Sequence, residues 1–137
     1  MVDEIDEKII KALMENSRKT YVEIGNIVGL SEGAVRNRVQ ALVNSGTIRK
    51  FTVEVAPSIR VRSLTMISVD PSIPTYAISK KVEGLSGIES IYEVTGEYDI
   101  VCVVSQRDIE GLNQTIEDIR KLDGVAKTNT VIVLRTL

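Results

Sequence analysis

The hydrophobic period of the chain changes near its middle, and this change constrains the fold more than any other feature. In the first fifty residues, apolar residues recur three and four positions apart, as on the buried side of a helix. After Pro57, runs with the two-residue period of strands alternate with helical runs in the order β-α-β-β-α-β. The pattern predicts two domains, at residues 1–50 and 60–137, with residues 51–59 as a connecting strand or linker.

Capping residues divide the first domain into three helices. Asp3 is placed to cap a helix over residues 5–15. Residues 20–23 have the Thr-x-x-Glu spacing of a capping box, which begins a second, short helix. Gly29 is expected to end that helix in the left-handed conformation, and Ser31 to cap a third helix.

The second and third of these helices have the spacing of a helix-turn-helix. Gly25 is a small residue where the two helices cross, Gly29 lies in the turn, and Val35 points inward from the third helix. Alternating residues over positions 47–55 predict a short two-stranded wing or a connecting strand. We therefore expect the first domain to be a (winged) helix-turn-helix.

The order of elements in the second domain is that of the split βαβ sandwich. We expect strands at residues 64–69, 89–94, 98–105 and 128–135, a helix from Pro74, a helix from Ile109, and a tight turn at residues 95–97. Right-handed crossovers close these elements into one four-stranded sheet with both helices on the same face. The predicted fold class is α+β, with a C-terminal ferredoxin-like βαββαβ sandwich.

The second face of this sheet is also expected to be apolar. Residues 100–104 and 131–134 are apolar at consecutive positions, so both faces of these strands favour burial. A second subunit is the simplest cover, because monomers rarely expose apolar patches beyond a few hundred Å². The alternative is a monomer with an unusually apolar sheet.

The composition argues against several classes of function. The chain has no histidine, which removes imidazole bases, Ser-His and Cys-His pairs and histidine metal ligands, and it has neither a P-loop nor a dinucleotide motif. We expect no catalytic or metal-binding residues and no cofactor; an enzyme would have to use Asp99 or a neighbouring Glu as its acid or base. Cys102 lies in an apolar run and is predicted to be a buried structural thiol.

The termini and apolar runs bear on where the protein acts. The first six residues are acidic, unlike the basic start of a signal peptide, and no apolar run is long enough to span a bilayer. We expect a cytoplasmic protein with no membrane partner.

Positive charge is concentrated around the third helix, although 17 Lys and Arg against 19 Asp and Glu give the chain a net charge of −2. No acidic residue lies between Gly33 and Val53. The helical projection turns Arg36, Asn37 and Gln40 away from the inward stripe, with Arg38 at its flank. The side chains of Arg36, Asn37 and Gln40 have the donors and acceptors that read base edges, and Arg49 and Lys50 suit phosphates. The expected DNA-binding residues are Ser31, Arg36, Asn37, Arg38, Gln40, Arg49 and Lys50.

Two other interpretations of this helix stay open. Surface helices commonly carry Arg and Gln for helix propensity alone, which would make it an ordinary solvated face. The helix could also recognise a protein, in an effector-binding oligomerisation module.

The whole chain resembles the Lrp/AsnC family of feast/famine regulators. The resemblance rests on residues 5–10, 28–31, 38–42, 46–48, 95–99 and 124–125, together with Thr128 and Thr130. It implies dimers that bind palindromic promoter DNA, associate further into tetramers, octamers or discs, and often respond to amino acids. The third helix departs from some members in having Glu32 and Gly33 near its start and fewer basic residues.

The resemblance also implies an effector site at the Gly-x-x-Asp loop. Backbone amides around Gly96 suit a small carboxylate, and Asp99 suits an α-ammonium group. The expected effector-binding residues are Thr95, Gly96, Tyr98, Asp99, Thr128 and Thr130, with a free amino acid as the ligand. The alternative is a hairpin in which Gly96 serves only the turn and Asp99 only a local hydrogen bond.

Overall fold

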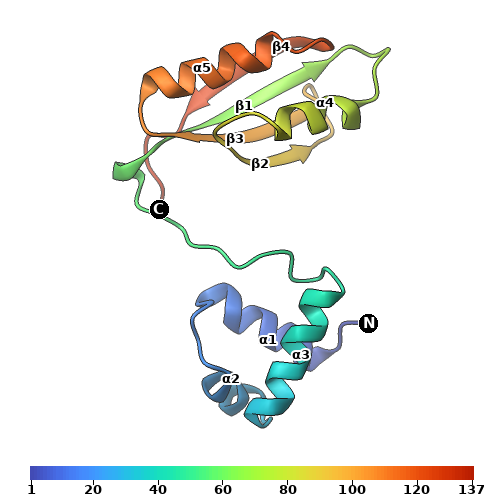
Figure 1. Cartoon of the computed structure of the whole chain (residues 1–137), viewed down its shortest axis with the longest axis vertical. Coiled ribbons are helices and arrows are strands. Elements are labelled where there is room, and N and C mark those ends of the chain that lie inside the picture. The colour runs from blue at the N-terminus through green and yellow to red at the C-terminus, as the bar shows by residue number, and fades with distance from the viewer. The chain divides into compact units, whose positions relative to one another are not determined.

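The computed structural model describes all residues, Met1–Leu137, and its contacts divide them into two compact units, Met1–Glu54 and Val55–Leu137 (Figure 1). The first unit contains α1 (Glu4–Glu15), α2 (Tyr21–Val28) and α3 (Glu32–Asn44). The second contains a short 3-10 helix, η1 (Pro57–Ile59), a four-stranded sheet and two helices. No helix is both long and apolar enough to cross a membrane.

The helices of the first unit begin at the predicted caps. Asp3 accepts a hydrogen bond from the Asp6 amide at 2.8 Å, and the Asp6 carboxylate accepts one from the Asp3 amide. Thr20 and Glu23 form the same reciprocal box at α2, and the Ser31 hydroxyl caps α3. These bonds satisfy amides that have no partner within the helix. The three predicted helix starts are thereby confirmed.

Two glycines set the turn between α2 and α3. Gly29 has φ +76°, the left-handed conformation that glycine adopts without strain, and its amide and that of Leu30 both donate to the Gly25 carbonyl. A Cβ at Gly25 would collide with the Leu30 backbone carbonyl oxygen. The close approach of these two backbones therefore requires glycine at position 25.

The strand or wing predicted over residues 47–55 is wrong. This segment has no strand pairing, and Phe51 and Val53 are 53% and 78% exposed. An alternating pattern forms a strand only where another strand pairs with it, and the chain offers no such strand here.

The second unit confirms the predicted ferredoxin-like topology. Its strands are β1 (Val61–Val69), β2 (Ile88–Glu93), β3 (Ile100–Gln106) and β4 (Val125–Ile132), and its helices are α4 (Thr75–Glu83) and α5 (Ile109–Arg120). The strand order is β2-β3-β1-β4, all antiparallel. Both helices lie against one face of the sheet (Figure 1).

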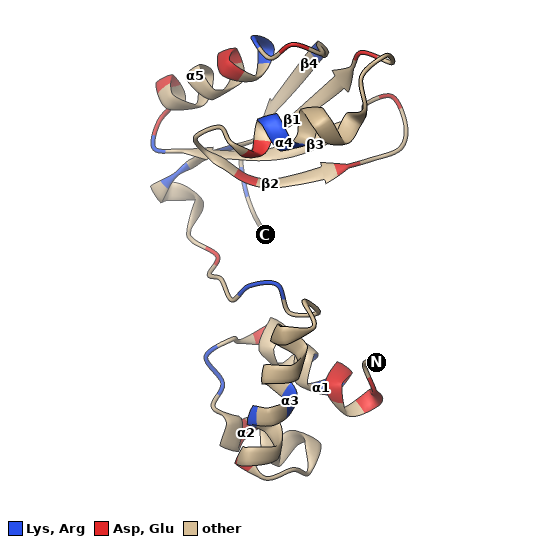
Figure 2. Cartoon of the chain, turned by 45° about the vertical axis from the view of Figure 1, so that its right-hand side comes forward, with Lys and Arg blue, Asp and Glu red and all other residues tan.

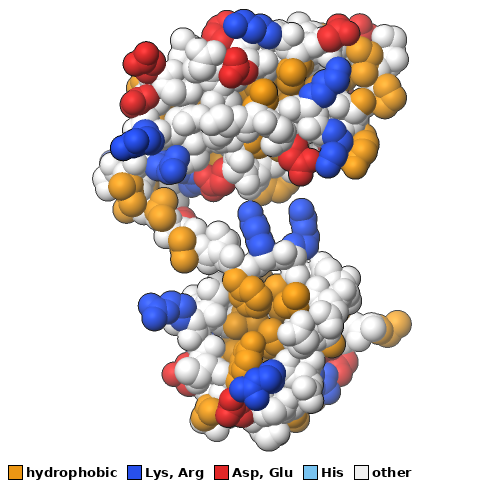
Figure 3. Space-filling view, in the orientation of Figure 1, with side chains coloured by type: hydrophobic (Ala, Val, Ile, Leu, Met, Phe, Trp, Pro, Cys, Tyr) orange, Lys and Arg blue, Asp and Glu red, His pale blue; other side chains and the backbone are white.

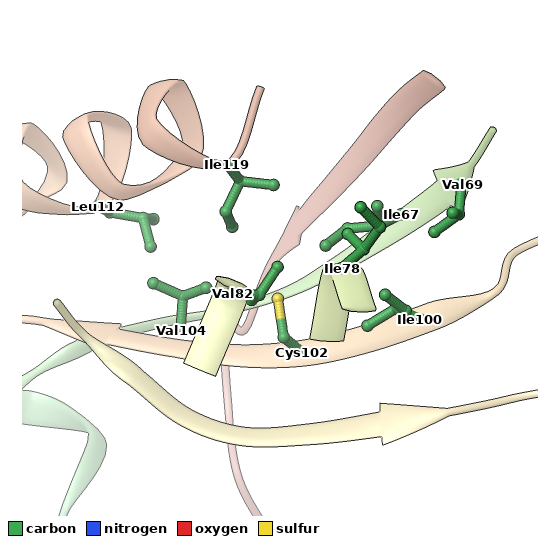
Figure 4. Packing of buried hydrophobic residues seen from close by; sticks show 9 residues of the cluster. All are labelled: Ile67, Val69, Ile78, Val82, Ile100, Cys102, Val104, Leu112 and Ile119. Atoms are coloured by element: carbon green, nitrogen blue, oxygen red, sulfur yellow. The ribbon is translucent and has the colours of Figure 1, made fainter. Parts of the chain in front are cut away.

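The core of this unit lies between the two helices and the sheet. Its buried residues are Ile67 and Val69 from β1, Ile100, Cys102 and Val104 from β3, Ile78 and Val82 from α4, and Leu112 and Ile119 from α5 (Figure 4). Cys102 is fully buried, as predicted, and burial raises the pKa of its thiol to about 11.

The other face of the sheet is uncovered and partly apolar. Because Ile67 and Val69 face the helices, alternation turns Leu64 and Met66 to the opposite side. Leu64 and Val131, which are paired across β1 and β4, are 38% and 45% exposed.

The strand boundaries differ from those predicted by one to three residues: β1 begins at Val61, β2 spans Ile88–Glu93 and β3 spans Ile100–Gln106. β4 begins at Val125 and ends at Ile132, because Gly124, with φ +99°, turns the chain directly into the strand; the predicted apolar run continues past the strand to Leu134, which is exposed. The connection between β2 and β3 is longer than the three-residue turn, and the Val94 amide donates to the Asp99 carbonyl at its base.

The glycine contact gives a direct test of the helix-turn-helix geometry. We expect Gly25→Ala to lower the free energy of unfolding by about 2 kcal/mol or more, because the obstructing atom is backbone and cannot rotate away. Gly33→Ala is the matched control: a Cβ there meets nothing within 4 Å, and alanine should stabilise α3 by up to roughly 1 kcal/mol. Urea unfolding of the full chain measures both, and equal stability of the two variants would contradict the crossing geometry.

Candidate functional site

The first candidate site is the exposed face of α3. Val35, Val39 and Leu42 are buried, while Arg36, Asn37 and Gln40 are exposed. Acidic residues gather at the start of α1, and basic residues lie on α3 and on the segment that follows it (Figure 2). The helix thus presents hydrogen-bonding side chains on its solvent side, as the period predicted.

Two of these side chains have partners on the helix surface. The Arg36 guanidinium pairs with the Glu32 carboxylate and lies 5.6 Å from the centre of the Tyr21 ring. The Gln40 amide donates to the Asn44 side-chain oxygen at 2.9 Å. Exposed pairs of this kind stabilise a helix by only about 0.2–1 kcal/mol, so a ligand can displace them at small cost.

Arg38 lies elsewhere. Its Nη1 donates to Asp3 at 2.7 Å and to Asp6 at 3.0 Å, on the first turn of α1. The bond from Arg38 is the main cause that lowers the pKa of Asp3, and the same bonds raise the pKa of Arg38. Helical periodicity placed Arg38 correctly at the flank of the exposed face, but its partners are more than thirty residues away and could not be inferred from local spacing.

The remaining residues predicted for this site lie at the two ends of α3. Ser31 is exposed, and its hydroxyl oxygen accepts the Ala34 amide at 3.2 Å, which leaves the hydroxyl proton free to donate. Arg49 and Lys50 are exposed in the segment after the helix and form no ion pair within the chain.

The second candidate site is the loop between β2 and β3. Thr95 and Gly96 are exposed, and Gly96 has φ +114°, which favours glycine. Tyr98 and Asp99 are half-buried. The loop therefore brings four of the six predicted effector residues together at one end of the sheet.

Asp99 has a defined structural partner. The pairing of β1 with β4 is irregular between Ser68 and Val69, and the Val69 amide donates to Asp99 Oδ2 at 2.7 Å. The Asp99 amide in turn donates to the Ile67 carbonyl. Asp99 thus satisfies a backbone amide at the irregularity, and its second carboxylate oxygen accepts no hydrogen bond within the chain.

Thr128 and Thr130 are on β4 and have other partners. They pair with Ile67 and Thr65, whose side chains are buried, so alternation turns both hydroxyls to the helix side of the sheet. Thr130 Oγ1 is 3.1 Å from Thr65 Oγ1, and Arg120 donates to Thr128. Neither threonine side chain forms a hydrogen bond to the loop that contains Asp99.

Lys127 contacts the loop instead. Its Nζ is 3.6 Å from Glu97 Oε1 and 5.4 Å from the centre of the Tyr98 ring. Sequence reasoning missed Lys127, because its position beside the loop depends on the register of β4 on β1. The sequence did offer one signal. Lys127 and Thr128 are adjacent at the start of the predicted strand, so their side chains point to opposite faces of the sheet and only one of the two can line a given site.

The comparisons with known proteins agree with this architecture. Residues 2–43 match the AsnC-type helix-turn-helix domain, and residues 63–137 match the Lrp/AsnC ligand binding domain. The HTH-type transcriptional regulator LysM of Sulfurisphaera tokodaii is 44% identical over 134 residues, covering 98% of this chain and 96% of that protein.

Solved structures of similar chains share the fold. The feast or famine regulatory protein from M. tuberculosis, complexed with L-methionine, has a TM-score of 0.83 at 28% identity, covering 99% of this chain and 94% of that one. AsnC from E. coli has a TM-score of 0.75 at 28% identity, with the same coverage. With both domains matched in order along its length, this chain belongs to the Lrp/AsnC family of transcriptional regulators.

Proposed function

We propose that the protein is a homo-oligomeric, cytoplasmic regulator that reads duplex promoter DNA with α3 and changes its activity when a free amino acid binds the second unit. The observation that carries the proposal is the exposed face of α3. Arg36, Asn37 and Gln40 lie there with only weak surface partners, in a stretch without acidic residues from position 34 to 52.

The chemistry of the α3 face fits base edges. Arginine donates two bonds to guanine, and the side-chain amides of asparagine and glutamine pair with adenine in the same two-point manner. Arg49 and Lys50, together with the free Ser31 hydroxyl proton, flank this face and suit phosphate oxygens. Arg36, Asn37 and Gln40 would therefore read the base sequence, and Ser31, Arg49 and Lys50 would bind the DNA backbone.

The uncovered sheet face supports self-association. Leu64 and Val131 form part of an apolar surface, and on the same face Arg62 has a buried Nε without a hydrogen-bond partner. The first unit also exposes hydrophobic side chains (Figure 3), among them Phe51 and Val53. A second copy of the chain would remove apolar area from water on both units.

The loop at Asp99 supports amino-acid binding. A zwitterion loses water around both charges in a pocket, so each charge needs a partner. The free oxygen of Asp99 suits the ammonium group, while the amides around Gly96 and the Lys127 ammonium suit the carboxylate. Thr128 and Thr130 would join such a site only by leaving their present partners, so we assign them a secondary role.

The first test concerns DNA reading. With an operator selected from random duplexes by the full chain, replacing Arg36, Asn37 or Gln40 by alanine should weaken operator binding by about 1–3 kcal/mol more than random-duplex binding. Lys50→Ala should weaken both alike. Gel-shift titration measures the affinities. If Arg36→Ala weakened binding to the operator and to random duplexes equally, Arg36 would have no role in sequence reading. If the wild type bound no duplex at all, the result would favour an α3 that binds protein.

The second test concerns the sheet face. Leu64→Lys should raise the free energy of dimer association by about 3 kcal/mol or more, because an unpaired charge would be buried between subunits. Tyr76→Lys, the same substitution at an exposed residue of α4, should leave association unchanged. Light scattering of the full chain over a concentration series measures both; a wild type that stays monomeric would refute association through this face.

The third test concerns the effector. Asp99→Asn keeps a side-chain oxygen for the Val69 amide but removes the charge, so it should abolish most amino-acid affinity while the fold and effector-free DNA binding persist. Calorimetry with each of the twenty amino acids, on the wild type and the variant, measures this. If the wild type binds none of them, the loop is only a turn.

A further inference from the structure

Arg38 occupies a position on α3 from which a basic residue could contact DNA, yet its guanidinium is held by α1. One nitrogen, Nη1, donates to two carboxylates, at 2.7 Å to Asp3 and at 3.0 Å to Asp6. Charge-assisted bonds of this length are roughly twice as strong as neutral ones. If Arg38 left these two bonds to contact a phosphate, the carboxylates of Asp3 and Asp6 would lie beside each other without a positive partner.

The partners of Arg38 are themselves part of the α1 cap. Asp3 accepts the Asp6 amide through Oδ1 and Arg38 through Oδ2, and Asp6 accepts the Asp3 amide through Oδ2 and Arg38 through Oδ1. All four carboxylate oxygens are therefore used. The Asp6 side chain is only 12% exposed, so its bond to Arg38 is shielded from solvent.

The charge of this cluster opposes attraction to DNA. Two carboxylates and one guanidinium sum to −1, so Arg38 adds no net positive potential to the surface of α3. What the cluster does provide is a fixed link between the first turn of α1 and the second turn of α3.

We propose that Arg38 is a positioning residue, which sets the orientation of α3 through Asp3 and Asp6 and makes no phosphate contact. This inference rests on the proposed reading of DNA by α3. Base-edge hydrogen bonds depend on orientation, whereas attraction to phosphates depends mainly on charge. Loss of the link should therefore reduce discrimination between operator and random DNA more than it reduces binding to random DNA.

The salt dependence of binding distinguishes the two roles. Each phosphate contact contributes about −0.9 to the slope of log K against log salt, so Arg49→Gln should make the slope shallower by roughly that amount. Arg38→Gln, which removes the same charge, should leave the slope unchanged and lower the operator-to-random affinity ratio about tenfold, the equivalent of one charge-assisted hydrogen bond.

Asp6→Asn separates the two roles, because electrostatics and positioning predict different changes in DNA binding for this variant. It removes a negative charge near α3, so electrostatics alone would strengthen DNA binding. Positioning predicts instead that the operator-to-random ratio falls, as it does for Arg38→Gln. Glu7→Gln, the same kind of charge change at an exposed residue of α1 with no ion pair, is the control and should not lower the ratio.

The experiment is a gel-shift series at four salt concentrations with the full chain and each variant, run below the unfolding temperature of every variant. A shallower slope for Arg38→Gln, or an unchanged ratio for Asp6→Asn, overturns the inference; the shallower slope would also make Arg38 a phosphate contact. If Arg38→Gln fails to fold, Asp6→Asn and Asp3→Asn still decide between the roles. A wild type that binds no duplex refutes the proposed function itself, which is a different result.

Discussion

The second unit depends on β1, one of the two central strands that have a hydrogen-bonded neighbour on both sides. It pairs with β3 along one edge and with β4 along the other, and its alternate residues from Ser63 to Val69 are buried under the helices. The pairing of β1 with β3 ends at Ile67, whose carbonyl accepts the Asp99 amide from the adjoining loop. The Val69 amide lies beyond this end, and the Asp99 carboxylate accepts it.

Features determined within a few residues could be predicted from the sequence. Asp3, Thr20 and Ser31 each bond an amide three residues ahead, so a short stretch of sequence contains the whole interaction. The β-α-β-β-α-β order followed from local periods, and the placement of both helices on one face of a single sheet followed from the chirality of its crossovers. Gly25 was recognised as a crossing residue from its distance to the turn.

Features that join distant segments could not be predicted in the same way. The exposed face of α3 followed from its period, but the bonds of Arg38 to α1 required knowledge of how the two helices pack. The chemistry of the Asp99 loop was predictable from its residue types, whereas its contact with Lys127 needed the register of β4. The alternating pattern at residues 47–55 predicted a strand, but a strand also needs a neighbouring strand to pair with. The chain has no strand beside this segment, so the prediction failed.

The burial of Cys102 has a practical consequence for following the two units separately. With its pKa raised to about 11, roughly one thiol in a thousand is ionised at pH 8, and the side chain is fully enclosed. The first unit contains no cysteine at all. A cysteine placed on an exposed position of that unit would therefore be the only thiol to take a fluorophore or spin label in the native protein, and Cys102 would become reactive only when the second unit opens.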